Sequence, residues 1–152
     1  MKTSNLLSLL IWAAVGLVFL TIAREMCLGQ AKSNTGCLSY ESTVVKLEGT
    51  LIRKTFPGPP NYESVRRGDK PEIFWLLALL HPVCIEPGED SDLDPAQKDI
   101  RTIQLVVSPD VYKTQRNLVG KRVMVSGTLF GAHNTHHRTP ALLTVKSITN
   151  AE

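Results

Sequence analysis

The sequence predicts a mostly β domain built as a small barrel, and two observations carry this prediction. Residues 45–51 (VKLEGTL) and 123–129 (VMVSGTL) resemble each other and alternate apolar with polar residues, as half-buried strands do. Each also has a glycine, Gly49 or Gly127, at an inward position in mid-strand. Glycine there marks a bulge or the tight bend of a barrel corner, so we expect both positions to be structural.

Three further segments complete the predicted strands. Residues 73–80 (IFWLLALL) are apolar throughout, as in a strand covered on both faces, although a short buried helix has the same pattern. Residues 100–107 alternate and place Gln104 on the outer face, and residues 141–148 form the last strand.

A short helix is predicted between the third and fourth strands. Ser108 is a good N-cap, Pro109 suits the first helical position, and Gly120 closes the turn that follows. Leu118 is placed to rest on the barrel.

This order of elements, with bent first and fourth strands, is similar to the OB-fold, a five-stranded Greek-key barrel. In that fold the first and fourth strands are neighbours, so the two glycine bends are expected side by side. A five-stranded open sheet with one helix is the alternative architecture.

The beginning of the chain predicts export. Residues 6–23 (LLSLLIWAAVGLVFLTIA) carry no charge and are intermediate in length between a signal-peptide core and a spanning helix. We therefore expect an N-terminal apolar helix within residues 1–31, either a cleaved signal peptide or a retained membrane anchor with its linker. Residues 32–152 then form one domain, periplasmic or extracellular, soluble or anchored to the cytoplasmic membrane. A buried helix of a soluble domain is the other interpretation of residues 6–23.

The cysteines agree with an oxidising compartment. Cys27 lies beside the apolar segment, which leaves Cys37 and Cys84 as a pair near the ends of the first two strands. We expect a disulfide between them, with two buried free thiols as the alternative.

The charge balance and the motifs exclude several function classes. The chain has 17 basic and 14 acidic residues, a net charge of +3, without the strong basic bias of a nucleic-acid binder. No nucleophile elbow or phosphate-binding glycine loop occurs, so no catalytic residue is predicted. The acidic segment 86–99 has alternating aspartates, but Pro95 and Arg101 stand where a calcium-binding EF-hand needs glycine and glutamate.

Two unusual loops carry the candidate site. In an OB-like barrel the loops joining strands one to two and four to five flank the ligand-binding face. Here these loops are residues 55–71 and the histidine loop, residues 131–140. They contribute the following candidate ligand-binding residues: Phe56, Tyr62, Arg66, Arg67, His133, His136, His137 and Arg138.

We expect these side chains to share one pole and to suit an anionic or ring-bearing ligand, or an acidic patch on a partner. Imidazoles gain charge as pH falls toward 6, which is expected to strengthen such binding. The alternative is that the loops pack against each other and cover the barrel end.

No cofactor is predicted from the motifs. A zinc or other divalent transition-metal site at His133, His136 and His137 is the alternative, but adjacent residues on an extended chain point to opposite sides.

The chain also resembles a known family. Residues 120–145, with the pattern GKRVMVSGTLF followed by HHRTP, are similar to the bacterial domain of unknown function 4431. The matching positions include His136, His137, Thr139 and Pro140, and FPGPPNYES and HPVC upstream extend the resemblance. The family has no established activity, so the resemblance implies kinship and no mechanism.

Together these observations predict an exported, non-enzymatic binding module that uses the two loops. Its ligand is an unknown envelope protein or a small anionic or ring-bearing molecule, and nucleic acid is not expected. The alternatives are a metal-binding protein and an immunity or inhibitor protein of the cell envelope.

Overall fold

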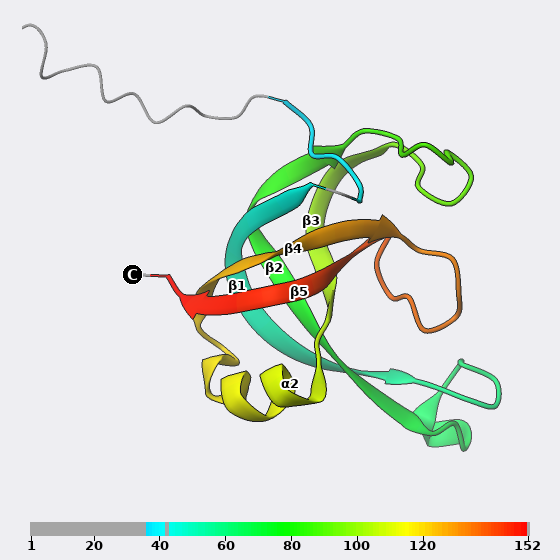
Figure 1. Cartoon of the computed structure of the whole chain (residues 1–152). Helices are drawn as coiled ribbons and strands as arrows, with labels where there is room; N and C mark the ends of the chain where they lie inside the picture. Colours follow the sequence, from blue (N-terminus) through cyan, green and yellow to red (C-terminus); the bar gives the residue numbers. More distant parts are fainter. Residues whose placement is uncertain (1–35, 42, 152) are drawn as a thin grey trace, which may run out of the picture. The chain divides into compact units, whose positions relative to one another are not determined.

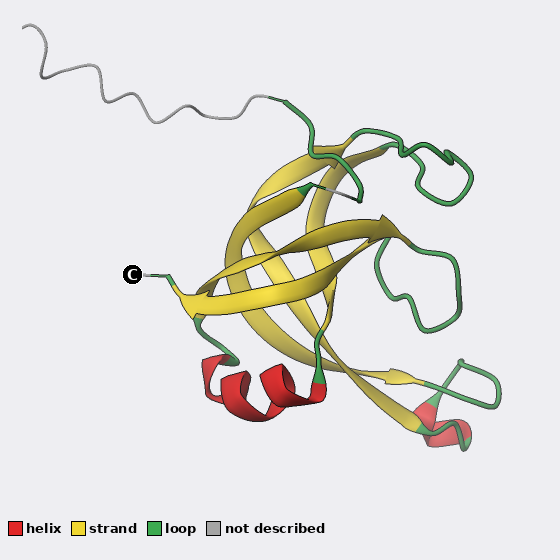
Figure 2. Cartoon of the chain, in the orientation of Figure 1, coloured by secondary structure: helices red, strands yellow, loops and turns green. Residues whose placement is uncertain are grey.

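The computed structural model describes residues 36–41 and 43–151, so the apolar segment 6–23 and its predicted helix lie outside the described residues. The described part contains strands β1 (Val44–Pro57), β2 (Pro71–Ile85), β3 (Gln97–Val106), β4 (Arg122–Gly131) and β5 (Ala141–Asn150). Its helices, all short, are η1 (Val65–Arg67), α2 (Pro109–Gln115) and η2 (Arg116–Leu118) (Figure 2). The predicted mostly β architecture, with one short α-helix between the third and fourth strands, is confirmed. Across these same residues, no helix is long and apolar enough to cross a membrane.

The five strands close into a barrel in the order β1-β2-β3-β5-β4 (Figure 1). All neighbours are antiparallel except β3 and β5, which pair in parallel and close the barrel. The alternative of an open sheet is therefore not the one that forms.

The hairpin of β1 and β2 extends further than predicted. Its pairing continues to Pro57 opposite Pro71, so the connecting loop is residues 58–70 and Phe56 lies in β1. The paired strands project from the barrel and carry the loop at their tip (Figure 1). At its other end β2 continues to Ile85, beyond the predicted end at residue 80, so His81 lies within it.

The two glycines explain how β1 and β4 bend. A Cβ on Gly49 would overlap the carbonyl oxygen of Ala78 in β2, and one on Gly127 would overlap that of Thr144 in β5. The ladder between β4 and β5 has a register shift at Ser126 and Gly127, as expected of a bulge. The strands β1 and β4 are neighbours, as predicted. The two glycines are not side by side, however, because Gly127 lies opposite Val45 and Gly49 lies opposite Val123.

The barrel interior is filled mostly by aliphatic side chains from all five strands, together with Trp75, and Leu118 of η2 packs in the same core. The helix begins as predicted, because the Ser108 side chain accepts a hydrogen bond from the Val111 N–H, and Gly120 has a φ of 87°. Of residues 73–80, predicted to be covered on both faces, only Trp75, Leu76 and Leu77 are buried. The largest fully buried core side chains are Leu51, Leu77, Ile85, Ile103, Leu129, Leu142, Leu143, Val123 and Val125.

A disulfide joins Cys37 to Cys84, which confirms the predicted pair and excludes two free thiols. Cys84 lies within β2 rather than after it. The bond holds the segment before β1 against the end of β2, where Leu38 forms a parallel bridge with Ile85.

Candidate functional site

The loop of residues 58–70 is organised around Asp69. This carboxylate is 4% exposed and accepts hydrogen bonds from the backbone N–H groups of Asn61, Glu63 and Ser64 at 2.9, 2.7 and 2.7 Å. The same N–H donors lower the pKa of Asp69, so it stays ionised at neutral pH and holds the loop. Asp69 is not among the site residues predicted from the sequence, although an aspartate that closes a polar, proline-containing turn is a signal for such a role.

The histidine loop is held on the outer face of β3 by Gln104, which is 3% exposed. Its side chain donates to the His136 carbonyl at 3.1 Å and accepts from the Arg138 N–H at 2.6 Å. The Gln104 N–H also donates to the Thr139 hydroxyl at 2.9 Å. Gln104 does face away from the barrel interior, as predicted, but the loop covers it.

Tyr62 and His136 bring the two loops together at one pole. Their rings meet edge to face with centroids 5.6 Å apart, and the Tyr62 hydroxyl lies 3.5 Å from His136 Nε2. His136 Nδ1 lies 3.1 Å from the carboxylate of Glu72, at the start of β2. Tyr62 takes a φ of 60°, which is unusual for a residue with a side chain and indicates that its surroundings hold it in place.

Arg138 connects the histidine loop to the hairpin. Its guanidinium donates to the Pro57 carbonyl at 2.7 Å and to Glu72 at 3.1 Å. The rings of Phe56, Tyr62 and Phe74 surround it, with centroids 5.4, 5.6 and 5.8 Å from Cζ. The side chain is 13% exposed and its Nε has no hydrogen-bond partner within the described part of the chain. Arg138, predicted to contact a ligand, is therefore engaged by the protein's own groups.

His133 and His137 form a separate pair at the start and end of the loop. Their rings are 4.7 Å apart, and His137 Nδ1 accepts a hydrogen bond from the His133 N–H at 3.0 Å. Burial lowers the pKa of His137, and the neighbouring His133 and His136 lower it further. His137 therefore favours its neutral form, contrary to the gain of charge near pH 6 predicted from the sequence.

The three imidazoles do not converge. His136 is turned toward Tyr62 and Glu72, whereas His133 and His137 face each other beside Phe130. Among the residues that the structure describes, no group of three His, Cys, Asp or Glu side chains is arranged to hold a metal ion. The alternative metal site at His133, His136 and His137 stays a prediction, and in this arrangement the three imidazoles are not positioned as a common set of ligands.

Arg66 and Arg67 lie at the tip of the hairpin, in η1. Arg67 forms an exposed ion pair with Glu63, and over residues 36–41 and 43–151 neither arginine bonds to the histidine loop. The structure thus brings Phe56, Tyr62, His136 and Arg138 into one cluster and leaves the two arginines at its edge.

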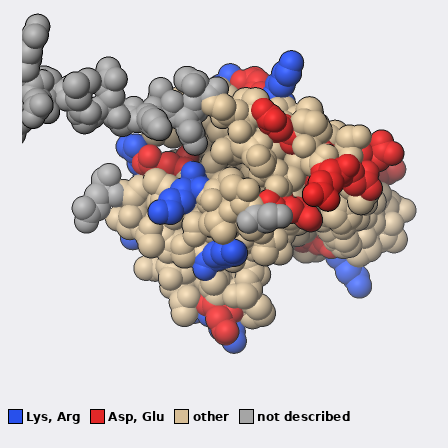
Figure 3. Space-filling view, turned by 45° about the horizontal axis from the view of Figure 1, so that its top comes forward, with Lys and Arg blue, Asp and Glu red and all other residues tan. Residues whose placement is uncertain are grey.

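The acidic connector between β2 and β3 supports the base of the histidine loop. Asp94 accepts a hydrogen bond from the Gly131 N–H at 2.6 Å, and a Cβ on Gly131 would overlap the Leu93 carbonyl. Asp90 accepts from the Asp92 N–H in a local turn, which is not the geometry of a calcium loop. Figure 3 shows acidic side chains gathered on the side of the molecule that carries this connector.

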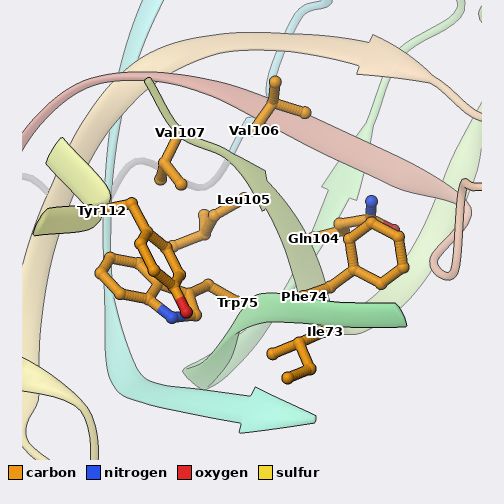
Figure 4. Close-up of a pocket in the computed structure, with 8 residues that line it drawn as sticks. All are labelled: Ile73, Phe74, Trp75, Gln104, Leu105, Val106, Val107 and Tyr112. Atoms are coloured by element: carbon orange, nitrogen blue, oxygen red, sulfur yellow. The ribbon is translucent and has the colours of Figure 1, made fainter. Parts of the chain in front are cut away.

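A pocket of about 250 Å³ adjoins the cluster where β2 and β3 diverge (Figure 4). Tyr112 of α2 stacks on Trp75 at one end of it, with ring centroids 4.9 Å apart. Phe74 and Gln104, which belong to the loop cluster, form its other end. The lining is mostly apolar and consists of Ile73, Phe74, Trp75, Gln104, Leu105, Val106, Val107 and Tyr112.

These features define the described part as a small, disulfide-bonded β-barrel domain with two coupled loops and an adjoining pocket. Residues 102–149 match the model of a family described as a domain of unknown function (DUF4431), which confirms the resemblance predicted from the sequence. The match runs from β3 to β5 and includes Gln104, the helices between β3 and β4, and the histidine loop, whereas β1 and β2 lie outside it. A comparison with curated proteins found no match.

Proposed function

We propose that the protein is an exported, non-enzymatic binding module with an OB-like fold. The strand order, with β1 between β2 and β4 and the helix between β3 and β4, supports the OB-like assignment. The Cys37–Cys84 disulfide supports an oxidising compartment outside the cytoplasm. Residues 6–23 are the proposed export signal or anchor.

The observation that carries the proposal is the direct contact of the two loops at one pole. Asp69, Gln104 and Arg138 hold both loops in a single arrangement before any partner arrives. A preordered surface loses less conformational entropy when it binds, so such an arrangement favours a binding role.

The charges that remain available on this surface are basic. The acidic residues of the hairpin are occupied: Glu63 by Arg67, Asp69 by backbone N–H groups, and Glu72 by Arg138 and His136. Arg66 and Lys70 have no ion-pair partner among the described residues. His136 faces Glu72 on one side but leaves its side chain 51% exposed to a ligand. The proposed ligand is therefore an anionic group on an envelope protein.

Site-specific photo-crosslinking in intact cells tests this proposal. A crosslinker placed at Arg66, on the hairpin tip, is expected to capture a discrete partner. The same crosslinker at Lys146, exposed on β5, is the matched control and is expected to capture none. Equal capture at both positions, or none at either, would contradict the proposal. An envelope hydrolase as the captured partner would identify the module as an inhibitor.

The histidine loop provides a second arm of the experiment. Replacing His136 and His137 with alanine is expected to reduce the Arg66 crosslink while leaving the unfolding transition in place. His81→Ala, on the part of β2 away from the loops, is the control. If the double replacement unfolds the domain, the histidine loop serves the fold and not the ligand.

A further inference from the structure

We infer that this surface binds an extended, acidic peptide segment of a partner protein, which pairs with the open edge of β2 and places an apolar side chain in the pocket of Figure 4. The inference rests on the proposed binding function and specifies the chemistry of the partner.

The first argument is the unpaired edge of β2. β1 pairs with β2 from Pro71 onward, but pairing between β2 and β3 begins only at Trp75, opposite Leu105. Residues 71–74 therefore have a β1 neighbour on one side and no strand on the other, within the described part of the chain. An edge of this kind presents backbone N–H and C=O groups that another extended chain can satisfy.

The space beside this edge is open because β3 turns away. Val106 still pairs with Thr144 of β5, and the chain then leaves through Val107 into α2. An incoming strand would take the place that β3 would have occupied had it continued. Backbone pairing of this type requires an extended polypeptide and not a small molecule.

The pocket supplies a site for one side chain of that polypeptide. It lies between the open edge and the departing end of β3, and no charged residue lines it. Ile73, Val106 and Tyr112 are 41%, 41% and 39% exposed, although large apolar side chains are usually covered. Three of the large apolar side chains that the described residues expose thus gather here, as at a recognition site.

The surrounding charges favour an acidic partner. Arg53 and Lys54 are the cross-strand neighbours of Trp75 and Phe74, Lys70 precedes β2, and Lys113 follows Tyr112. None of these four forms an ion pair among the described residues. The carboxylates in the same segments are Glu72, already paired with Arg138, and Asp110. Arg53, Lys54 and Lys113 are thus direct neighbours of residues that line the uncharged pocket, and they attract aspartate and glutamate on either side of an apolar residue.

Selection from a displayed library of random heptapeptides against the purified full-length protein tests the inference. Enriched peptides are expected to be acidic and to share one large apolar residue at a fixed position. Ile73→Asp, which puts a charge at the pocket, is expected to weaken their binding at least tenfold. Leu80→Asp is the matched control, because Leu80 is also an exposed apolar residue of β2 at 49% exposure. An equal loss in both variants, or no enriched acidic class, would overturn the inference.

Backbone pairing is tested separately from charge. A selected peptide is made in two versions that carry N-methyl groups on alternate residues, one version in each register. Each version lacks the N–H donors along one of its edges. The version that is methylated along the edge facing β2 is expected to lose binding. Trp75 fluorescence reports occupancy once Trp12→Phe has removed the other tryptophan of the chain. Equal binding of peptides methylated in either register overturns strand pairing. Binding to phosphatidylglycerol vesicles that Ile73→Asp abolishes, without peptide binding, would assign the patch to a lipid surface instead.

The outcome also separates this inference from the function on which it rests. If the Arg66 crosslink persists in Ile73→Asp and no peptide class is enriched, the module binds its partner elsewhere on the pole. If the crosslink is absent altogether, the proposed function fails first.

Discussion

The two ends of β2 are fastened by different chemistry. At the Ile85 end, the Cys37–Cys84 bond and the backbone hydrogen bonds from Leu38 N–H to Cys84 and from Glu86 N–H to Leu38, both 2.8 Å, hold the preceding segment. At the Pro71 end, the hairpin loop is held by Asp69 and by the Arg138 contacts to Glu72 and Pro57.

This difference shows which end of the barrel can respond to its surroundings. A covalent bond and neutral backbone hydrogen bonds are insensitive to pH and salt, whereas ion pairs and carboxylate–amide bonds weaken as pH falls or salt rises. The hairpin loop and His136 are at the charged end, whereas the base of the histidine loop is held by Asp94 of the connector that follows Ile85. The disulfide therefore anchors one end of β2 under all of these conditions, whereas single substitutions can change the stability of the charged end.

Removal of the disulfide should have the largest effect. The bond closes a loop with a sequence separation of 47 residues, and the chain-entropy model gives a loss of about 4 kcal/mol when both cysteines are replaced. Denaturant unfolding of the Cys37→Ser, Cys84→Ser double variant measures it. If the amides of the hairpin loop also exchange faster in this variant, the two ends of β2 are not stabilised independently.

The barrel corner between the two ends should come next. Gly127→Val places a side chain against the Thr144 carbonyl, and overpacking of this kind should cost about 2 kcal/mol or more. A thermal unfolding curve records the loss. An unchanged melting temperature would mean that the corner tolerates a side chain, contrary to the contact with β5.

Removal of the Arg138 side chain, which pairs with Glu72, should lower the free energy of unfolding by about 2 kcal/mol. A buried ion pair costs roughly 3–5 kcal/mol when one partner is removed, and here the two side chains keep 13% and 21% exposure, which reduces the effect. Arg138→Ala is compared with Arg122→Ala, which breaks an ion pair with Glu48 at 54% and 29% exposure and should cost less than about 1 kcal/mol. Equal losses of unfolding free energy in the two variants would show that the Arg138–Glu72 pair stabilises no more than the exposed Arg122–Glu48 pair.

The Asp69 carboxylate controls the local order of the hairpin loop. Its pKa is lowered below the ordinary value of 3.8, so its contribution is present above that pH and is lost as pH falls through the lower folded value. Asp69→Asn should speed amide hydrogen exchange at Asn61, Glu63 and Ser64 at neutral pH, with the exchange of core amides unchanged. Slow exchange of these amides in the variant would show that backbone geometry alone holds the loop.

The smallest effect should be the pH response of the histidine loop. The pKa of His137 in the folded protein lies below the ordinary value of 6.5, so the neutral form is favoured. Its contribution is present above pH 6.5 and is lost as pH falls through the folded pKa. Wild-type unfolding free energy is expected to fall slightly in this window, and His137→Gln should remove that part of the dependence. His81→Gln is the control, and a flat wild-type profile would contradict the assignment.

The fold was largely predictable because its signals are local. Alternation located β1 and β4, the Ser108 and Pro109 cap located α2, and Gly49 and Gly127 located the corners. The ends of the strands were harder to predict. The last residues of β1 and the first of β2 pair with each other outside the barrel core, as at Pro57 and Pro71, so burial leaves no pattern there.

The candidate site was predictable in part of its membership and not in its contacts. The sequence by itself determined that two long loops rich in aromatic, basic and imidazole groups flank neighbouring strands, and that Cys37 and Cys84 are close. Only the tertiary structure decided that Gln104 is covered by the histidine loop, that Glu72 is the partner of both His136 and Arg138, and that Arg138 is enclosed. These contacts join residues 32 to 81 positions apart, so they depend on how the closed barrel places its loops and leave no periodic trace along the chain.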